Sequence, residues 1–193
     1  LEFYSVMRSV RAIEHSDVCI LLLDATRGFD GQVRNIFWLA ERNKKGIVIV
    51  VNKWDLIEKE TNTMRDFSLE MSLQFKSLSY YPVLFTSAKT KQRISDILKV
   101  AKKIYDLRLT SIGTSDLNKF LQKIIQLQSP PATKGKAISL KYMTQVSSAP
   151  HLFVIFTNYP KLIPLSYKRY IENRLRENFK LEGVPIRISF RKK

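Results

Sequence analysis

An Asn-Lys-x-Asp tetrapeptide, Asn52-Lys53-Trp54-Asp55, directly follows the apolar run Ile47–Val51. Such runs form strands buried in parallel sheets, and ligands of open α/β sheets bind at the carboxyl ends of these strands. The Asp55 carboxylate can accept hydrogen bonds from N1–H and the exocyclic amine of guanine, whereas adenine would oppose it with a lone pair. A site that depends on such a paired bond can reject the wrong base by ~10⁴-fold. Asn52 would bond the purine edge and tie its loop to neighbouring backbone, and the Lys53 stem would cover one face of the base.

A second loop with matching chemistry follows the next predicted strand, residues 83–85. Its backbone N–H at Ala88 would donate to guanine O6, Ser87 would brace the turn, and the Lys89 stem would cover the other face of the base. Chance alone would place the tetrapeptide in roughly one chain in 30 of this length. Two such loops in this order favour guanine recognition over the alternative that the tetrapeptide is only a turn and a helix cap. Trp54 is expected to pack in the interior.

A phosphate-binding half is not found in the 193 residues. A GTPase needs a Gly-rich loop with a Lys and a Ser or Thr for the phosphates and Mg²⁺. The only Gly-Lys pair, Gly135-Lys136, is followed by Ala137 and lacks the upstream glycine, and no Asp-x-x-Gly motif occurs. We therefore expect no catalytic residue and no metal ligand in this chain, and a phosphate-binding half upstream of Leu1. Alone, the chain is expected neither to hydrolyse GTP nor to bind a nucleotide tightly.

Apolar runs and helical spacings alternate along residues 1–110. The runs at 18–23, 47–51 and 83–85 predict strands, the first two buried on both faces. Apolar residues at helical spacing predict helices over 6–13, 32–43, 64–78 and 94–107. This order predicts a doubly wound α/β sheet.

A polar, Gly-containing stretch at 110–114 interrupts this pattern and predicts a domain boundary. Beyond it, apolar spacings predict a helix, two strands, a helix and a last strand over 115–125, 138–144, 152–156, 167–179 and 186–190. Residues 114–193 are therefore expected to form a small α+β domain. They hold 15 basic and 4 acidic residues, net +11, against 18 and 13, net +5, before them. This asymmetry favours a surface that meets phosphate over ordinary solubility charge.

The cysteine and histidine content excludes several classes of site. Cys19 is the only cysteine and lies in an apolar run, and His15 and His151 are isolated. These residues provide no disulfide framework and indicate no zinc site, and Cys19 is expected to be a small buried apolar residue. No apolar stretch reaches the length of a membrane span and no signal peptide is seen, so we expect no membrane partner and a cytoplasmic protein.

Beyond the two loops, the sequence resembles the Der (EngA) family of bacterial GTPases. The matching stretches of the first part are Tyr4-Ser5, Arg8, Arg11-Ala12-Ile13-Glu14, Asp24-Ala25-Thr26 and Val50-Val51-Asn52-Lys53-Trp54-Asp55-Leu56. Those of the tail are Thr144-Gln145-Val146, Ser166-Tyr167-x-Arg169-Tyr170-x-Glu172-Asn173-x-Leu175-Arg176 and Gly183-x-Pro185-Ile186-Arg187-Ile188. The resemblance implies a partial P-loop GTPase sheet over residues 1–110, from the later part of the family's second GTPase domain, and a KH-like domain over 114–193.

The resemblance also implies a function. Der proteins are ribosome-assembly GTPases that associate with the large ribosomal subunit, so this chain would be a fragment that supplies guanine recognition and a basic docking domain. The full-length protein would bind GTP or GDP with Mg²⁺. Its partners would be the large ribosomal subunit, ribosomal RNA and the upstream GTPase domains of the same chain. The alternative is a non-catalytic RNA- or ribosome-binding module on a GTPase-derived scaffold.

Matched position by position, the family's guanine-base residues fall on Asn52, Lys53, Asp55, Ser87 and Ala88. Lys89 departs from the family, which often has another residue there. The KH-like part lacks the Gly-x-x-Gly loop with which KH domains grip RNA, since residues 161–164 contain no glycine. RNA or ribosome contacts are therefore expected elsewhere, at Lys168, Arg169, Arg174, Arg176, Lys180, Arg191, Lys192 and Lys193. The alternative role of these residues is a solvated helix face and a frayed tail.

Overall fold

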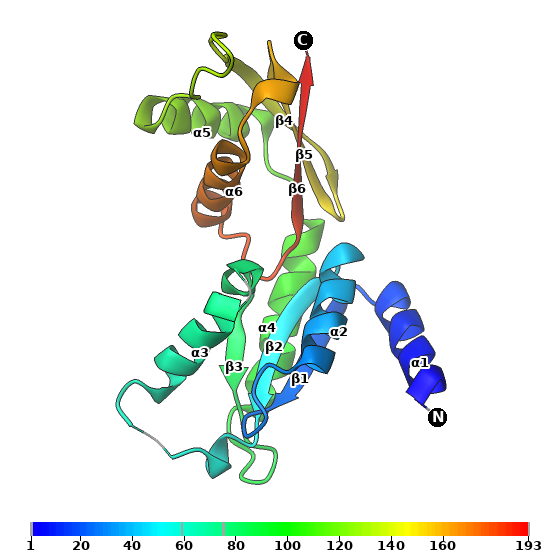
Figure 1. Cartoon of the computed structure of the whole chain (residues 1–193). Helices are drawn as coiled ribbons and strands as arrows, with labels where there is room; N and C mark the ends of the chain where they lie inside the picture. The colour runs from blue at the N-terminus through cyan, green and yellow to red at the C-terminus, as the bar shows by residue number, and fades with distance from the viewer. Residues whose placement is uncertain (1, 59, 75, 193) are drawn as a thin grey trace. The chain divides into compact units, whose positions relative to one another are not determined.

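The computed structural model describes residues 2–58, 60–74 and 76–192. The chain divides into two compact units (Figure 1). The first consists of Leu1–Leu107 and Glu182–Pro185, and the second of Arg108–Leu181 and Ile186–Lys193. Each unit has its own hydrophobic core and is described by itself.

The first unit contains a three-stranded parallel sheet in the order β1 (Val18–Asp24), β2 (Gly46–Asn52) and β3 (Val83–Phe85). Val51 of β2 pairs with Leu23 of β1 and with Phe85 of β3, so the three strands end at one edge of the sheet. Parallel strands need crossover connections, which the helices between them supply. The predicted α/β fold of this part is confirmed.

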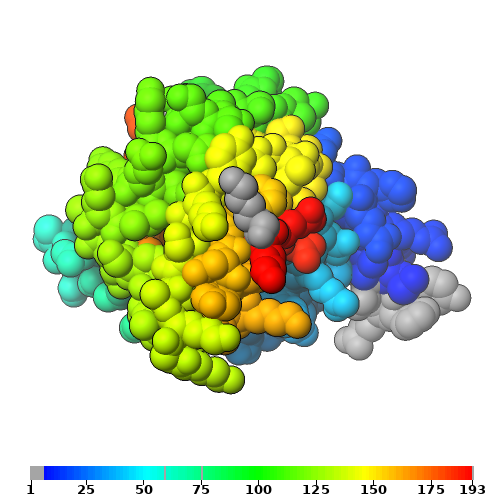
Figure 2. Space-filling view, turned by 90° about the horizontal axis from the view of Figure 1, so that it is seen from above, coloured from blue at the N-terminus to red at the C-terminus, as the bar shows by residue number. Residues whose placement is uncertain are grey.

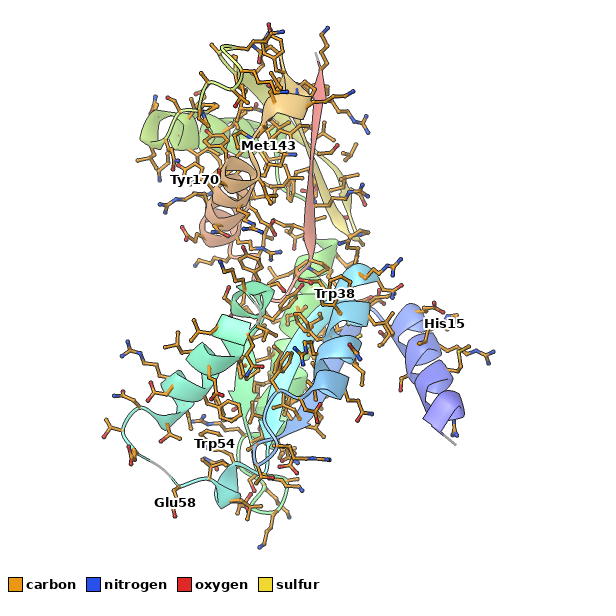
Figure 3. All side chains as sticks on the ribbon, viewed as in Figure 1. His15, Trp38, Trp54, Glu58, Met143 and Tyr170 are labelled. Carbon is orange, nitrogen blue, oxygen red and sulfur yellow. The ribbon has the colours of Figure 1, made fainter. Side chains whose placement is uncertain are left out.

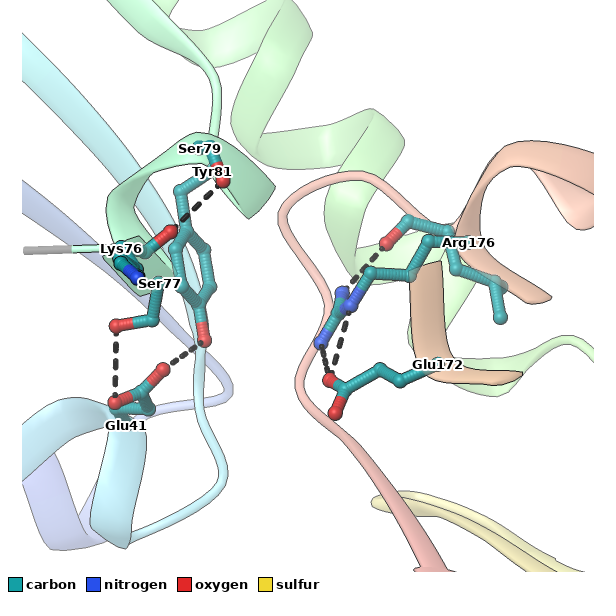
Figure 4. A network of polar contacts seen from close by, with 8 residues as sticks. Glu41, Lys76, Ser77, Ser79, Tyr81, Glu172 and Arg176 are labelled. Atoms are coloured by element: carbon teal, nitrogen blue, oxygen red, sulfur yellow. Dashed lines mark hydrogen bonds and ion pairs between the residues drawn. The ribbon is translucent and has the colours of Figure 1, made fainter. Parts of the chain in front are cut away.

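The helices up to Leu109 are α1 (Glu2–His15), α2 (Gly31–Arg42), α3 (Thr63–Gln74) and α4 (Ile94–Leu109), with 3₁₀ turns η1 (Trp54–Leu56) and η2 (Lys76–Tyr80). The helix predicted over 64–78 is too long, because α3 gives way to η2. Glu41 of α2 accepts hydrogen bonds from the hydroxyls of Ser77 (3.5 Å) and Tyr81 (3.3 Å), as Figure 4 shows. These tertiary bonds fasten the η2 turn to α2, while Leu78 is buried as its spacing predicts.

β2 is buried on both faces, as its unbroken apolar run predicts. Residues 46–51 are all buried. Ile47 and Ile49 enter one core, and Val48 and Val50 enter another on the opposite face. This strand therefore joins two cores in the first unit.

β1 differs from the prediction of burial on both faces. Ile20 is 44% exposed and Leu22 is 58% exposed, whereas Leu21 and Leu23 on the other face are buried. Cys19, expected to be buried, is only half-buried. β1 is the end strand of the sheet, and among the described residues no element covers the face of Ile20 and Leu22.

A short segment from far along the chain, Glu182–Pro185, completes the first unit. The backbone N–H of Gly183 donates to the Tyr80 carbonyl at 2.8 Å, and its carbonyl accepts from the Ile47 N–H at 3.0 Å. Val184 is fully buried in the core formed by one face of β2. The sequence predicts one boundary, at 110–114, and does not predict that a segment beyond it packs in the first unit.

The second unit is built from α5 (Thr114–Leu127), β4 (Leu140–Ser148), β5 (His151–Thr157), α6 (Leu165–Phe179) and β6 (Ile186–Lys192), with a 3₁₀ turn at η3 (Pro160–Leu162). The middle strand, β5, is antiparallel to β4 and parallel to β6. This order of helix, strand, strand, helix and strand is the predicted one, so the α+β fold is confirmed.

Both helices of the second unit and one face of its sheet form its core. Met143, Phe153 and Ile155 of the sheet are fully buried there. Figure 3 labels Met143 between the sheet and the helices, and Tyr170 on α6. The Tyr170 hydroxyl donates to the Ile124 carbonyl of α5 at 3.0 Å, which joins the two helices.

Candidate functional site

The two predicted guanine loops lie at the same edge of the first sheet. Asn52 is the last residue of β2, and the second loop directly follows β3. Backbone hydrogen bonds continue past the strand ends, from the Thr86 N–H to the Val51 carbonyl at 2.8 Å and from the Trp54 N–H to the Thr86 carbonyl at 3.0 Å. The strand register therefore places both loops side by side.

Asn52 joins the two loops directly. Its side-chain oxygen accepts a hydrogen bond from the Ala88 N–H at 3.0 Å. Tying this loop to neighbouring backbone is one of the roles predicted for Asn52. The same Ala88 N–H was assigned to guanine O6, so a bound guanine carbonyl would have to share or replace this bond.

The second loop is held by Ser87, which is fully buried. Its hydroxyl accepts from the Thr90 N–H at 3.1 Å, and its backbone exchanges two hydrogen bonds with Gln92 at 3.0 and 3.2 Å. These bonds brace the turn, as predicted for Ser87. Ala88 and Lys89 are exposed at the tip, where a ligand could reach them.

Lys53 is anchored by an acidic residue that sequence reasoning did not single out. Its ammonium lies 2.6 Å from the carboxylate of Asp24, the last residue of β1. The same carboxylate accepts from the backbone N–H and hydroxyl of Thr26 at 2.9 and 2.7 Å. The Lys53 hydrogen bond, followed by those from Thr26, lowers the pKa of Asp24 from 3.8 to about 2. The sequence does contain a signal for this pairing, because Asp24 directly follows a predicted strand of the same sheet, as Asn52-Lys53 does.

The remaining two residues of the tetrapeptide have different environments. Asp55 is half-buried in the first turn of η1. Trp54 is fully buried and packs against Phe85 and Phe67 at ring-centre distances of 4.3 and 5.6 Å. Figure 3 labels Trp54 beside the carboxyl edge of the sheet. The prediction that Trp54 packs in the interior is confirmed.

The predicted RNA contacts on α6 are not equivalent. Lys168 lies over the Phe190 ring at 5.5 Å, and Arg169 is exposed. Arg174 pairs with Glu177 at 3.0 Å. Lys180 is exposed just beyond the helix, in a left-handed conformation with φ 53°.

Arg176 stands apart from these residues because it is only 9% exposed. Its guanidinium binds the Glu172 carboxylate at 3.1 and 3.2 Å and donates to the Leu181 carbonyl at 3.1 Å (Figure 4). Both contacts fasten the end of α6. This geometry gives Arg176 a structural role rather than the surface expected of an RNA contact.

The last predicted contacts lie on β6. Arg191 and Lys192 are exposed, and their Cα partners on β5 are Phe156 and Thr157. Lys193 lies outside the described residues. Sequence reasoning did not include Arg187, which is exposed on the same strand two positions before Ser189.

Within the part of the chain that the structure describes, no three His, Cys, Asp or Glu side chains gather as a metal site. In P-loop GTPases a Ser or Thr of the phosphate loop and an Asp hold Mg²⁺ together with the phosphates. No such loop occurs in the 193 residues, so they do not supply this set of ligands. In the described ranges, no helix combines the length and the apolar character that crossing a membrane requires.

Two protein families match the chain. Residues 3–126 match the family described as "Elongation factor Tu GTP binding domain". Residues 111–191 match "KH-domain-like of EngA bacterial GTPase enzymes, C-terminal".

Curated relatives match along the whole chain. "GTPase Der" of Flavobacterium psychrophilum is 51% identical over 193 residues, and that of Christiangramia forsetii is 50% identical. "GTPase Der" of Alkaliphilus metalliredigens is 47% identical. In each case the match covers 100% of this chain and 44% of the relative, so the chain spans less than half the length of these relatives.

One solved structure that resembles the chain is a more distant relative in sequence. A crystal structure of Era in complex with MgGDPNP and nucleotides 1506–1542 of 16S ribosomal RNA is 17% identical, with a TM-score of 0.45. The match covers 97% of this chain and 68% of that chain. A likeness of this size does not bear on function.

Proposed function

The chain belongs to the Der (EngA) family, and from this premise we propose that it supplies guanine recognition and ribosome docking to a GTPase that assembles the large ribosomal subunit. The observation that carries the proposal is the hydrogen bond between Asn52 and Ala88, which holds the two guanine loops together at one sheet edge. GTP hydrolysis is proposed for the longer protein, because these 193 residues match 44% of their relatives.

The base-binding residues in this proposal are Asn52, Lys53, Asp55, Ser87, Ala88 and Lys89. Asp55 accepts from the two donors of guanine, which adenine does not offer. Asp24 holds the Lys53 ammonium at 2.6 Å, and the apolar stem of Lys53 is proposed to cover one face of the base. Ala88 and Lys89 approach the base from the second loop.

The phosphates and Mg²⁺ are assigned to a part of the protein other than these residues. The sequence holds no Gly-rich phosphate loop, and the described residues hold no acidic cluster for the ion. Mg²⁺ would neutralise phosphate charge when it is bound. This chain contributes the base specificity.

The second unit is proposed to dock on the large ribosomal subunit through ribosomal RNA, in the cytoplasm. Residues 114–193 carry a net charge of +11, which favours a phosphate-rich partner. The same charge also supports the second candidate, a non-catalytic RNA- or ribosome-binding module. The two candidates differ in whether the guanine loops bind a nucleotide.

A chimera tests the nucleotide role. These 193 residues replace the matching segment of the Flavobacterium psychrophilum relative, to which they are 51% identical. Fluorescent GDP should bind this chimera and should not bind the chain alone tightly. Asp55→Asn should abolish GDP binding at the site that this segment completes and should favour xanthosine diphosphate there, because xanthine carries a carbonyl where guanine carries its amine. GDP binding by the upstream GTPase domain of the relative should remain. Glu58→Gln, at an exposed neighbouring position, is the matched control and should bind GDP normally.

The outcomes separate the two candidates. The GTPase proposal is supported if the chimera binds GDP and hydrolyses GTP, and if Asp55→Asn makes the site prefer xanthosine diphosphate to GDP. A chimera that binds ribosomes, and whose nucleotide binding is the same with and without Asp55→Asn, supports the binding module. A chimera that prefers ATP to GTP would contradict guanine recognition.

A further inference from the structure

One face of the second unit's sheet points away from its helices. Met143, Phe153 and Ile155 point into the helix-covered core, and Phe190 lies beneath the ammonium of Lys168 on α6. Neighbouring residues of a strand point to opposite faces, so the strand register assigns a second set of side chains to the other face. We call the members of this set that reach solvent the open sheet face: Tyr142, Thr144, Leu152, Phe156, Arg187, Ser189 and Arg191. Val154 lies on the same face but is only 2% exposed.

An aromatic pair crosses the open sheet face. Tyr142 of β4 pairs with Phe156 of β5, and their ring centres lie 6.1 Å apart at an interplanar angle of 42°. Tyr142 is 40% exposed and Phe156 is half-buried. Aromatic side chains that reach solvent in this way stack on unpaired nucleic-acid bases, because every base has a π-face.

Basic side chains extend the same rows onto β6. Arg191 is the register partner of Phe156, and Arg187 is the register partner of Leu152. Both arginines are exposed. Tyr142, Phe156 and Arg191 therefore lie in one row across the three strands. In Figure 2, yellow atoms of the β4–β5 region and red atoms of β6 lie beside one another on the surface.

The charge of the sheet differs from that of the helices. No Asp or Glu lies in β4, β5 or β6. The acidic residues of the second unit are on its helices, Asp116 on α5 and Glu172 and Glu177 on α6. Arg174 and Arg176 of α6 pair with these glutamates. The helix charge is thus partly neutralised, whereas the strands carry basic residues and no acidic ones.

We propose that the open sheet face binds single-stranded RNA, with bases stacked on Tyr142 and Phe156 and phosphates held by Arg187 and Arg191. This inference rests on the proposed docking function of the second unit and names the surface and the form of RNA. The RNA must be single-stranded, because bases inside a duplex cannot reach the rings. Ser189, between the two arginines on the same face, can bond a base edge or a 2′-hydroxyl through its own hydroxyl.

Fluorescence anisotropy of the 193-residue chain with a labelled oligouridine tests the surface. Tyr142→Leu and Phe156→Leu keep apolar side chains and remove the rings, so each should weaken binding by roughly tenfold. Arg191→Gln should weaken binding and reduce the slope of log affinity against log salt by about 1. Arg169→Gln, on α6, tests the helix contacts predicted from the sequence. Lys119→Gln, at an exposed position of α5, is the control and should leave the affinity close to that of the wild type.

Base stacking can be detected directly by 2-aminopurine fluorescence, which would not depend on Tyr142 if that ring only stabilised the fold. Oligouridine with one 2-aminopurine should lose fluorescence when the base stacks on the wild-type chain. The loss should be absent in Tyr142→Leu at saturating protein. Circular dichroism checks that each variant keeps the wild-type fold.

The outcomes distinguish this inference from the docking function. If the leucine variants bind like the wild type and Arg169→Gln loses as much affinity as Arg191→Gln, the open sheet face is not the site and RNA docking survives on the helices. If the wild-type chain binds no RNA but the chimera binds ribosomes, the inference fails and the docking function survives through another contact. If neither binds, the inference and the docking function fail together.

Discussion

The sheets of the two units differ in how many of their faces are covered. In the first, the middle strand β2 is buried on both faces, and its polar chemistry begins only where the strand ends. In the second, α5 and α6 cover one face, and the other presents aromatic and basic side chains along the strands. A strand that is covered on both faces, such as β2, offers a ligand only its end, whereas a sheet with one face free of helices also offers that face.

The difference has a consequence for mutation. Side chains within β2 are expected to matter for stability alone, and function should respond at Asn52 beyond them. On β4 and β6, side chains such as Tyr142 and Arg191 are expected to matter for binding with little effect on folding. The following changes test this contrast, from the largest expected effect to the smallest.

Removing buried volume from β2 should have the largest effect. Ile49 is fully buried, so Ile49→Ala should lower the free energy of unfolding by about 2–5 kcal/mol. Val146→Ala, at a position of β4 that is 58% exposed, should change it by less than about 0.5 kcal/mol. Urea unfolding followed by circular dichroism measures both. Equal losses would contradict the contrast between the sheets.

Gly183 should tolerate no side chain. It has φ +75°, and a Cβ there would collide with the Cδ1 of Ile104 and lie 2.7 Å from its Cγ1 and 3.1 Å from the Cδ of Pro82. Gly183→Ala should therefore destabilise the first unit by about 2–4 kcal/mol, from left-handed strain and overpacking together. Gly28→Ala has a similar φ of +66° with nothing within 4 Å, and should cost only about 1 kcal/mol. The fluorescence of Trp38 and Trp54, both in the first unit, reports the unfolding.

Arg176 should behave as a core residue although it is charged. Arg176→Met leaves the Glu172 carboxylate and the Leu181 carbonyl without this donor, and should lower the free energy of unfolding by about 2–3 kcal/mol. Arg169→Met, at an exposed position on the same helix, should change it by less than about 0.5 kcal/mol. Thermal unfolding by circular dichroism compares them. If Arg176→Met leaves the free energy of unfolding unchanged, the structural role of Arg176 is wrong and Arg176 is again a candidate RNA contact.

Acid should act on the first unit through Asp24, with the smallest effect. Because the pKa of Asp24 is lowered to about 2 in the folded chain, folding is favoured by its ionised form. This contribution is complete above about pH 4 and is lost as the pH falls towards 2. Asp24→Asn should therefore flatten the acid dependence of tryptophan fluorescence in this range. Glu70→Gln, at an exposed helix position, should leave the dependence as in the wild type.

Much of the fold follows from local patterns. Each predicted strand and helix is present, because an apolar run or a helical spacing depends on neighbours within a few residues. The guanine loops were found for the same reason, since each follows its strand directly. The exceptions depend on distant residues. The helix predicted over 64–78 ends early, at a segment whose Ser77 bonds Glu41 of another helix.

The sequence by itself determined the order of elements, the two loops, the packing role of Trp54 and the basic tail. The tertiary structure alone decided that Asp24 holds Lys53, that Glu182–Pro185 completes the first unit, and that Arg176 is buried. It also decided that Ile20 and Leu22 stay exposed. The physical reason is that a periodic pattern specifies which face of an element is apolar, whereas the residues that pack against that face come from elsewhere in the chain.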